Sequence, residues 1–209
     1  MPRRRKRRSA NKRSNVAVML IFIAVGLFLI LGFKFLSSAE NSAPKVNTNS
    51  NPVEVEHAQF IRKVAPQAQK LQGQYNILPS ITIAQAILES NWGTSQLSQK
   101  YNNLFGVKAN GNLANSVYLN TQEFVNGKYV TVKARFQVYK SWNDSLTDHA
   151  RLLRNGTQWN GNQYSDVINA SNYRQGALAL QKDGYATDPA YTQKLIYIIR
   201  TYKLYQYDS

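Results

Sequence analysis

The sequence predicts an α+β fold, mostly helical with one small antiparallel β-hairpin, preceded by a single N-terminal transmembrane helix. Three observations lead to it: an unbroken apolar run near the N-terminus, apolar residues at helical spacing, and alternating apolar and polar residues over 116–139 around Asn126-Gly127. The 209 residues suffice for one hydrophobic core. The absence of cysteine excludes disulfides, thiolate metal sites and a catalytic thiol.

The N-terminal segment predicts a membrane anchor. Residues 1–15 contain eight basic residues and no acidic one, and residues 16–33 then run without a charge. As a helix this run spans about 27 Å, close to the bilayer hydrocarbon core. The positive-inside rule leaves a cytoplasmic tail at 1–15, an anchor at 16–34 and the rest of the chain outside the cell. Cleavage after Ala39, as in a signal peptide, is the alternative and exports the same part.

Residues 35–56 are rich in Ser, Asn and Pro and predict a flexible linker, because they hold too little apolar surface to fold. Residues 57–209 have a globular composition and form the predicted folded domain. The formal net charge of +15 falls to +7 when residues 1–15 are left out. A domain of this charge is expected to attract polyanions, and charge alone does not choose between nucleic acid, anionic lipid and anionic wall polymers.

Apolar spacing predicts the helices of this domain in order. The first covers 56–75, and Pro66 should interrupt it and open a new helix. The second covers 81–90, opened by Pro79 and capped by Ser80. Capping residues predict three more helices. A Ser-x-x-Asp box opens 141–153, an Asn opens 172–182 and an Asp-Pro pair opens 188–202.

The candidate catalytic groups are carboxylates. The two histidines, His57 and His149, form no metal-ligating pair, and there is no glycine-rich phosphate loop, so metal catalysis and a Ser-His-Asp triad are poorly supported. His149 is expected to be a surface or packing residue on an amphipathic helix. Residues 57–209 contain two glutamates, Glu89 and Glu123.

Glu89 lies in the last turn of an apolar helix. The helix dipole and apolar neighbours such as Trp92 should both raise its pKa, as a general acid at neutral pH requires. Glu123 lies three residues before the hairpin turn, where a strand edge can bring a second carboxylate over a cleft. Position alone leaves open that Glu89 is an ordinary exposed helix residue and Glu123 a solvent-facing strand residue.

Four segments together resemble glycoside hydrolase family 73, the β-N-acetylglucosaminidases of Gram-positive autolysins and of the flagellar peptidoglycan hydrolase. They are PSITIAQAILESNWG at 79–93, YNNLFGVKA at 101–109, TQEFVNGKYVTVKARFQVYKSWNDSLTDHARLL at 121–153 and GYATDPAYTQKLIYII at 184–199. The resemblance implies a lysozyme-like fold with a cleft between a helical lobe and a hairpin lobe. Asn91 departs from the family, which usually has glycine before the tryptophan.

The resemblance also implies the roles of particular residues. Glu89 corresponds to the general acid and Glu123 to the second carboxylate. Tyr185 corresponds to a cleft residue near the cleaved sugar, and Trp92, Phe105 and Asn103 are expected to shape the substrate-binding cleft. No metal or organic cofactor is implied.

The implied reaction is hydrolysis of the β-1,4 bond after N-acetylglucosamine in peptidoglycan, as an endo-β-N-acetylglucosaminidase. The attacking water is helped by Glu123 or by the acetamido group of the substrate, and the sequence does not choose. The alternatives are a muramidase or lytic transglycosylase of the same fold, and a non-catalytic wall-binding module. A membrane-tethered nucleic-acid binder is disfavoured, because topology explains the basic N-terminus. The expected partners are glycan strands, the membrane and anionic wall polymers, with no nucleic acid, and the chain is expected to be a monomer.

Overall fold

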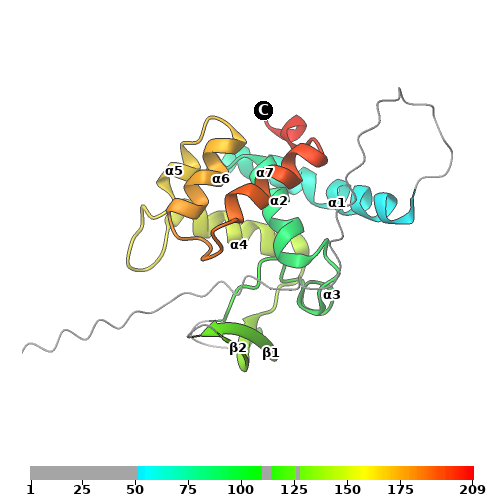
Figure 1. Ribbon diagram of the computed structural model, residues 1–209, viewed down its shortest axis with the longest axis vertical. Helices are drawn as coiled ribbons and strands as arrows, with labels where there is room; N and C mark the ends of the chain where they lie inside the picture. The colour runs from blue at the N-terminus through cyan, green and yellow to red at the C-terminus, as the bar shows by residue number, and fades with distance from the viewer. Residues whose placement is uncertain (1–50, 110–113, 126–127) are drawn as a thin grey trace, which may run out of the picture.

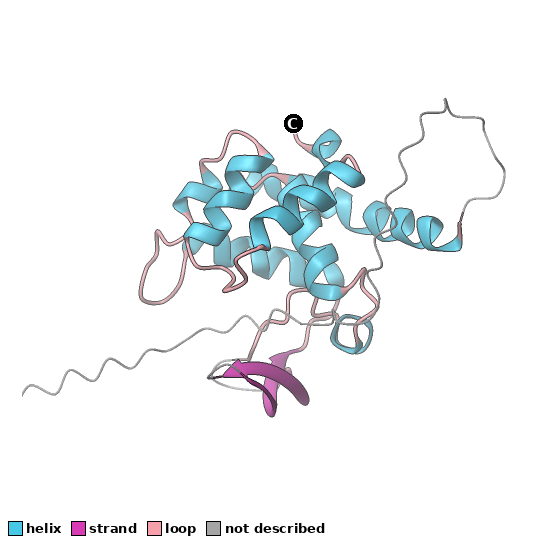
Figure 2. Ribbon diagram, viewed as in Figure 1, coloured by secondary structure: helices cyan, strands magenta, loops and turns pink. Residues whose placement is uncertain are grey.

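The computed structural model describes residues 51–109, 114–125 and 128–209, with the side chains of residues 122–129 outside the described part. Helices form one lobe, and a two-stranded hairpin lies apart from it on the side where α2 ends (Figure 1, Figure 2). In chain order the elements are α1 Pro52–Tyr75, α2 Pro79–Ser90, α3 Gln96–Tyr101, β1 Ser116–Val125, β2 Lys128–Gln137, α4 Trp142–Asn155, α5 Ser165–Ile168, α6 Tyr173–Lys182, α7 Tyr191–Thr201 and the 3-10 helix η1 Leu204–Tyr207.

Helix α2 is the centre of the helical lobe. Ten of its twelve residues are buried, and it packs against α1, α4, α6, α7 and η1. The helix is enclosed on nearly every side, and Leu88 and Glu89 at its last turn are the half-buried exceptions. Because so many elements hold α2, the direction of its last turn is fixed.

The N-terminus of α2 is capped from a distant part of the chain. The backbone N–H and the hydroxyl of Ser80 both donate to the carboxylate of Asp208, at 2.8 and 2.7 Å. The prediction that Ser80 itself caps the helix is therefore wrong, since its side chain makes no cap bond to the helix backbone. A carboxylate at this end also interacts favourably with the helix dipole.

The C-terminus of α2 ends in three successive left-handed residues. Asn91, Trp92 and Gly93 have φ angles of 50°, 60° and 72°. Asn91 is the C-cap, and its N–H donates to the carbonyl of Ile87. Asparagine is the usual substitute for glycine in this conformation, so the departure from the family pattern at Asn91 keeps the same helix ending.

Helix α1 corrects two predictions. It begins at Pro52, capped by Asn51, so residues 52–56 are helical rather than part of a flexible linker. Proline fits the first turn of a helix, where its missing N–H has no partner to lose. The helix also continues through Pro66 without a break. Pro66 is exposed while Val64 on the inner side is fully buried, so packing of the inner face holds the helix despite one lost backbone bond.

The predicted hairpin pairing is present. Strands β1 and β2 pair antiparallel from Ser116↔Gln137 to Val125↔Lys128, and the predicted turn at 126 and 127 lies outside the described residues. Asn103 fastens the base of the hairpin to the helical lobe. Its side-chain NH₂ donates to the carbonyls of Val107 and Gln137, both at 2.9 Å, and its Oδ1 accepts the N–H of Val107 at 3.0 Å.

Two of the three remaining predicted helices begin at their expected capping residues. Ser141 caps α4 as predicted, accepting the N–H of Asp144 at 3.2 Å and donating its hydroxyl to the Asp144 carboxylate. Asn172 caps α6 as predicted. The prediction that Asp188 and Pro189 open the last helix is wrong, because α7 begins at Tyr191 with Ala190 as its N-cap. The short elements α3, α5 and η1 carry no periodic signal long enough to predict them.

No helix among the described residues is long and apolar enough to cross a membrane. The segment predicted to be an anchor, 16–34, lies outside the described part of the chain, as does the cleavage alternative after Ala39.

Gly93→Ala tests the helix ending. A Cβ at this position would lie 2.5 Å from Cη2 of Trp142 and 2.9 Å from Cε2 of Phe60, on a backbone with φ of +72°. Because both the clash and the left-handed backbone oppose a side chain, the free energy of unfolding should fall by about 2 kcal/mol or more. Urea denaturation of the variant and the parent chain measures this loss.

Gly73→Ala is the matched control. Gly73 is exposed within α1, and a Cβ there would meet nothing within 4 Å. Alanine should raise the free energy of unfolding by roughly 0.5–1 kcal/mol at such a helix position. A Gly93→Ala variant as stable as Gly73→Ala would show that position 93 does not need glycine.

Candidate active site

The carboxyl group of Glu89 lies between α2 and α7. Tyr191, the first residue of α7, donates its hydroxyl to Oε1 of Glu89 at 2.8 Å. The side-chain NH₂ of Gln85 donates to the same tyrosine oxygen at 3.1 Å. Gln85 and Glu89 are one helical turn apart on the same face of α2. Gln85 and Glu89 therefore both bind the Tyr191 hydroxyl from the face of α2 that contacts α7.

The second carboxyl oxygen of Glu89 has no such partner. Oε2 is buried and makes no hydrogen bond to any described residue. Burial raises the pKa of Glu89 from 4.5 to about 7, against the opposing effects of the Tyr191 hydrogen bond and the positive charge of Lys194. Lys194 is itself paired with Asp188 at 2.7 Å. A carboxyl with a pKa near neutrality and one unpartnered oxygen can deliver a proton.

Behind this carboxyl lies a layer of buried rings. Tyr185 stacks against Tyr191 with ring centroids 5.8 Å apart, and its hydroxyl lies 3.1 Å from Nε2 of His149. His149 in turn stacks on Phe105 at 3.9 Å. All of these rings are 2% exposed or less. The packing role expected of His149 is confirmed, and Phe105 is a core residue below the site.

Trp92 and Asn103, which were expected to shape the cleft, both make contacts within the protein. Trp92 is half-buried and contacts other aromatic rings: it stacks on His57 at 3.5 Å and meets Phe60 and Tyr202 edge-on. The hydrogen-bonded aromatic neighbour of Glu89 is Tyr191, where the sequence suggested Trp92. Asn103 is 1% exposed, and its amide is occupied by the backbone bonds at the hairpin base.

Glu123 is placed only by its backbone. It pairs with Val130 in the hairpin and stands an even number of residues from Val117, whose partner Phe136 is buried. By strand alternation, position 123 is on the same sheet face as the buried Phe136. The side chain of Glu123 lies outside the described part, so its separation from Glu89 stays a prediction.

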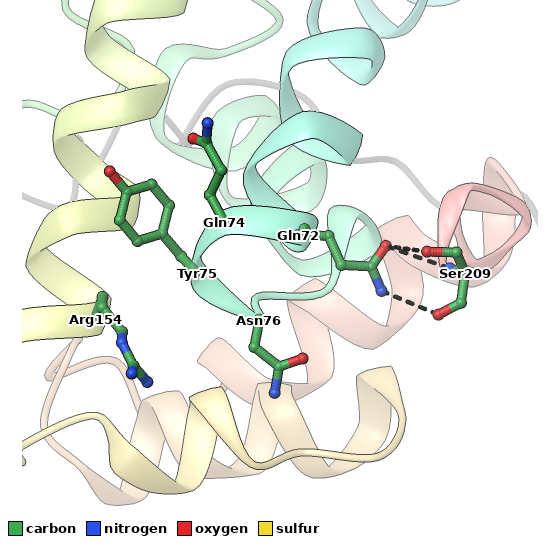
Figure 3. Close-up of a pocket in the computed structure, with 7 residues that line it drawn as sticks. Gln72, Gln74, Tyr75, Asn76, Arg154 and Ser209 are labelled. Carbon is green, nitrogen blue, oxygen red and sulfur yellow. Dashed lines mark hydrogen bonds between the residues drawn. The ribbon is translucent and has the colours of Figure 1, made fainter.

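The surface pockets lie away from these residues. One, of about 380 Å³, is lined by Gln72, Gly73, Gln74, Tyr75, Asn76, Arg154 and Ser209 (Figure 3). A second, of about 550 Å³, lies beside Arg154, Gly161 and Ile168. Neither includes a residue that the sequence proposed for the site, so neither is the place where the predicted chemistry would occur.

Sequence reasoning missed Tyr191 and Gln85. Both could have been found, because Gln85 is a polar residue in an apolar helix exactly one turn before Glu89, and Tyr191 opens the helix that follows the Tyr185 motif. The sequence does not show that these two residues are in contact, because 106 positions separate them. Only the packing of α2 on α7 brings them together.

A carboxylic acid that stays protonated near neutral pH is the group that glycosidases use to protonate a leaving oxygen. Here it ends the central helix of a helical lobe that carries one hairpin. This combination places the chain in the class of glycoside hydrolases with a lysozyme-like fold.

Comparison with known proteins identifies the family. Residues 65–204 match the glucosaminidase family, described as mannosyl-glycoprotein endo-beta-N-acetylglucosaminidase. The exo-glucosaminidase LytG of Bacillus subtilis is 40% identical over 204 residues, covering 97% of this chain and 70% of that protein. The catalytic domain of the autolysin Auto of Listeria monocytogenes is 40% identical, with a TM-score of 0.70 over 77% of this chain and 90% of that one.

A further relative carries a different name. The probable N-acetylmuramidase of Lactococcus lactis subsp. cremoris is 41% identical over 81% of this chain, which spans only 38% of that protein. The family match covers most of the folded domain, and the chain belongs to the glucosaminidase family, glycoside hydrolase family 73. The chain is therefore a glycoside hydrolase.

Glu89→Gln should change stability in a pH-dependent way. The folded chain binds the Glu89 proton up to about pH 7, whereas an unfolded carboxyl loses it near 4.5. The stability that the protonated form contributes is therefore complete below about pH 4.5 and is lost as pH rises through 7. A neutral glutamine avoids that loss, so at about pH 8 the variant should be more stable by about 3 kcal/mol, and near pH 4 it should not. Urea denaturation across this pH range measures the difference.

Glu54→Gln serves as the control, since Glu54 is exposed in the first turn of α1. Its charge there is mildly favourable to the helix, so its removal should give no gain at about pH 8. An equal gain in both variants would mean that burial of the Glu89 carboxyl is not the cause.

Proposed function

We propose that this chain hydrolyses the β-1,4 bond that follows N-acetylglucosamine within peptidoglycan strands, with Glu89 as the general acid. The observation that carries the proposal is the carboxyl of Glu89: one oxygen is held by Tyr191, and the other is buried without a partner. The family supports the bond type, and the names of the relatives, an exo-glucosaminidase and an autolysin, support a wall substrate.

The acid step follows from the two oxygens of Glu89. Because Tyr191 donates to Oε1, that oxygen is already occupied by a hydrogen bond, and the proton of the neutral acid is placed on Oε2. Oε2 transfers it to the glycosidic oxygen as the bond to the sugar breaks. The resulting carboxylate keeps the Tyr191 hydrogen bond, which stabilises the charge left behind.

Water then attacks the sugar by one of two routes. In one, Glu123 acts as base and the product has the inverted configuration. In the other, the acetamido group of the substrate attacks first and the product keeps its configuration. The resemblance implies that Tyr185 lies close to that sugar, but its ring is buried behind Glu89 and its hydroxyl is bonded to His149, so neither route assigns it a step. The anomer formed first, observed by proton NMR of a fresh digest, distinguishes the routes.

Digestion of purified peptidoglycan tests the proposal. The parent chain should release ends with reducing N-acetylglucosamine, identified by mass spectrometry after borohydride reduction. Glu89→Gln should lower the rate by about 10²–10⁴-fold, the usual contribution of a general acid, while Glu54→Gln should leave it unchanged. Activity should also fall as pH rises above about 7, because Glu89 then loses its proton.

Other product ends would overturn the bond assignment. Reducing N-acetylmuramic acid would indicate a muramidase, the activity named for the Lactococcus relative. Anhydro-muramic ends would indicate a lytic transglycosylase. Release of terminal sugars alone would indicate exo attack, as in the name of LytG. A digest with no new glycan ends would instead support the interpretation that the domain is a non-catalytic wall-binding module.

We also propose that residues 16–34 anchor the chain in the cell membrane with the enzyme domain outside. The proposal rests on the apolar run and on the eight basic residues before it. The chain should sediment with membranes, resist extraction by high salt, and lose its domain to protease added to protoplasts. Recovery of the whole domain in the culture medium, beginning at residue 40, would show cleavage after Ala39 instead.

A further inference from the structure

His149 is a buried polar side chain next to the Glu89 site that the proposed reaction does not use. It comes from α4, is 1% exposed, and lies between the ring of Phe105 and the hydroxyl of Tyr185. Its Nδ1 has no hydrogen-bond partner among the described residues. A histidine that served packing alone would be replaceable by a phenylalanine, which fills similar space without an unpartnered nitrogen.

The hydroxyl of Tyr185 makes one hydrogen bond in the described part, to Nε2 of His149 at 3.1 Å. Oε2 of Glu89 is buried and has no hydrogen-bond partner in the described part. The two groups belong to one site, because Tyr185 stacks on Tyr191 and Tyr191 binds the neighbouring oxygen of Glu89. The charge of Glu89, together with burial, raises the pKa of Tyr185 well above its usual value.

A second hydroxyl donated to Glu89 would harm a general acid. Hydrogen bonds to a carboxylate favour its ionised form and lower its pKa. One such bond is already present, from Tyr191, and burial outweighs it. A second bond, to Oε2, would both stabilise the carboxylate and occupy the oxygen from which the proton leaves.

We propose that His149 is a positioning residue of the glycosidase reaction, which binds the Tyr185 hydroxyl and so keeps it away from Oε2 of Glu89. The proposal rests on the proposed role of Glu89 as the acid. Histidine suits the task because its ring presents a nitrogen to Tyr185 while its face packs on Phe105. It stays uncharged, since burial lowers its pKa to about 3, and so adds no positive charge beside the acid.

The groups that face Glu89 are few enough for a clean pH test. From α7 they are Tyr191 and Lys194, and Lys194 is paired with Asp188. From the segment before α7 comes Tyr185, with Tyr164 of the α5 region and His149 of α4 behind it. The tyrosines stay neutral through the range of interest because burial raises their pKa.

His149→Phe is the first variant. The freed Tyr185 hydroxyl should turn to Glu89, and the pKa of Glu89 should fall by about one pH unit, the order expected for one hydrogen bond to a charged group. The full-length chain, labelled with ¹³C at the glutamate carboxyl carbons, reports this directly, because it contains only five glutamates and Glu89→Gln identifies the signal. The same shift should appear in the basic limb of the pH profile of kcat/KM on peptidoglycan.

The double variant His149→Phe/Tyr185→Phe decides the cause. With the Tyr185 hydroxyl removed and only that of Tyr191 left on Glu89, the pKa of Glu89 should return to within a few tenths of a unit of its value in the parent chain. His149→Gln keeps a side-chain acceptor for the Tyr185 hydroxyl, so the pKa of Glu89 should be the same as in the parent chain. This variant also serves if His149→Phe does not fold.

Three results would overturn the proposal: an unchanged Glu89 titration in His149→Phe, an upward shift, or a downward shift that persists in the double variant. The carboxyl titration needs no substrate, so it stands apart from the reaction assignment. If the parent chain released no new glycan ends, the proposed function would be wrong. The titration of Glu89 would still test whether His149 binds the Tyr185 hydroxyl away from Glu89.

Discussion

Withdrawal of one carboxyl group from water is the constraint on which the rest of this structure depends. Glu89 must be buried enough to keep its proton near neutral pH, yet remain at the end of a helix where a substrate can arrive. Burial dominates its pKa, and the surrounding charges are arranged so as not to cancel that effect. Lys194 is neutralised by Asp188, and the histidine one layer behind is uncharged. The one hydrogen bond that a described residue makes to this carboxyl, from Tyr191, lowers the pKa of Glu89 less than burial raises it.

The enclosure of α2 follows from the same constraint. A carboxyl can be desolvated reproducibly only if its helix cannot rotate or slide, and α2 is held by four helices and the 3-10 turn η1. Both of its ends are fixed as well: Asp208 binds its first turn, and three left-handed residues stop it one residue after Glu89. Gly93 is needed at that stop because Trp142 and Phe60 leave no room for a side chain.

Local signals in the sequence predicted the elements that local forces form. The hairpin around residues 126 and 127, the capping box at Ser141 and the cap at Asn172 depend on residues a few positions apart, and all three match the structure. Two of the predictions that failed depended on distant contacts. Asp208 replaces Ser80 as the cap of α2, and packing of the inner face carries α1 through Pro66.

The candidate site shows the same division. Glu89 was a candidate from its place at the end of an apolar helix, the family resemblance singled it out, and its pKa is raised as expected, through burial. No local signal pairs it with Tyr191, because 102 positions separate the two residues in the chain. Phe105 and Asn103, expected to shape the cleft, are almost fully buried, since the sequence marks them as belonging to the site region but gives no sign of which way they point.

The attachment of the hairpin has a mechanical consequence. Glu89 is part of a core held from several sides, whereas Glu123 is part of a ribbon fastened at its base, where the amide of Asn103 binds the backbone of Val107 and Gln137. The position of Glu89 is thus set by core packing from several elements, whereas the backbone position of Glu123 depends on the hydrogen bonds at the base of the hairpin, those of the Asn103 amide among them.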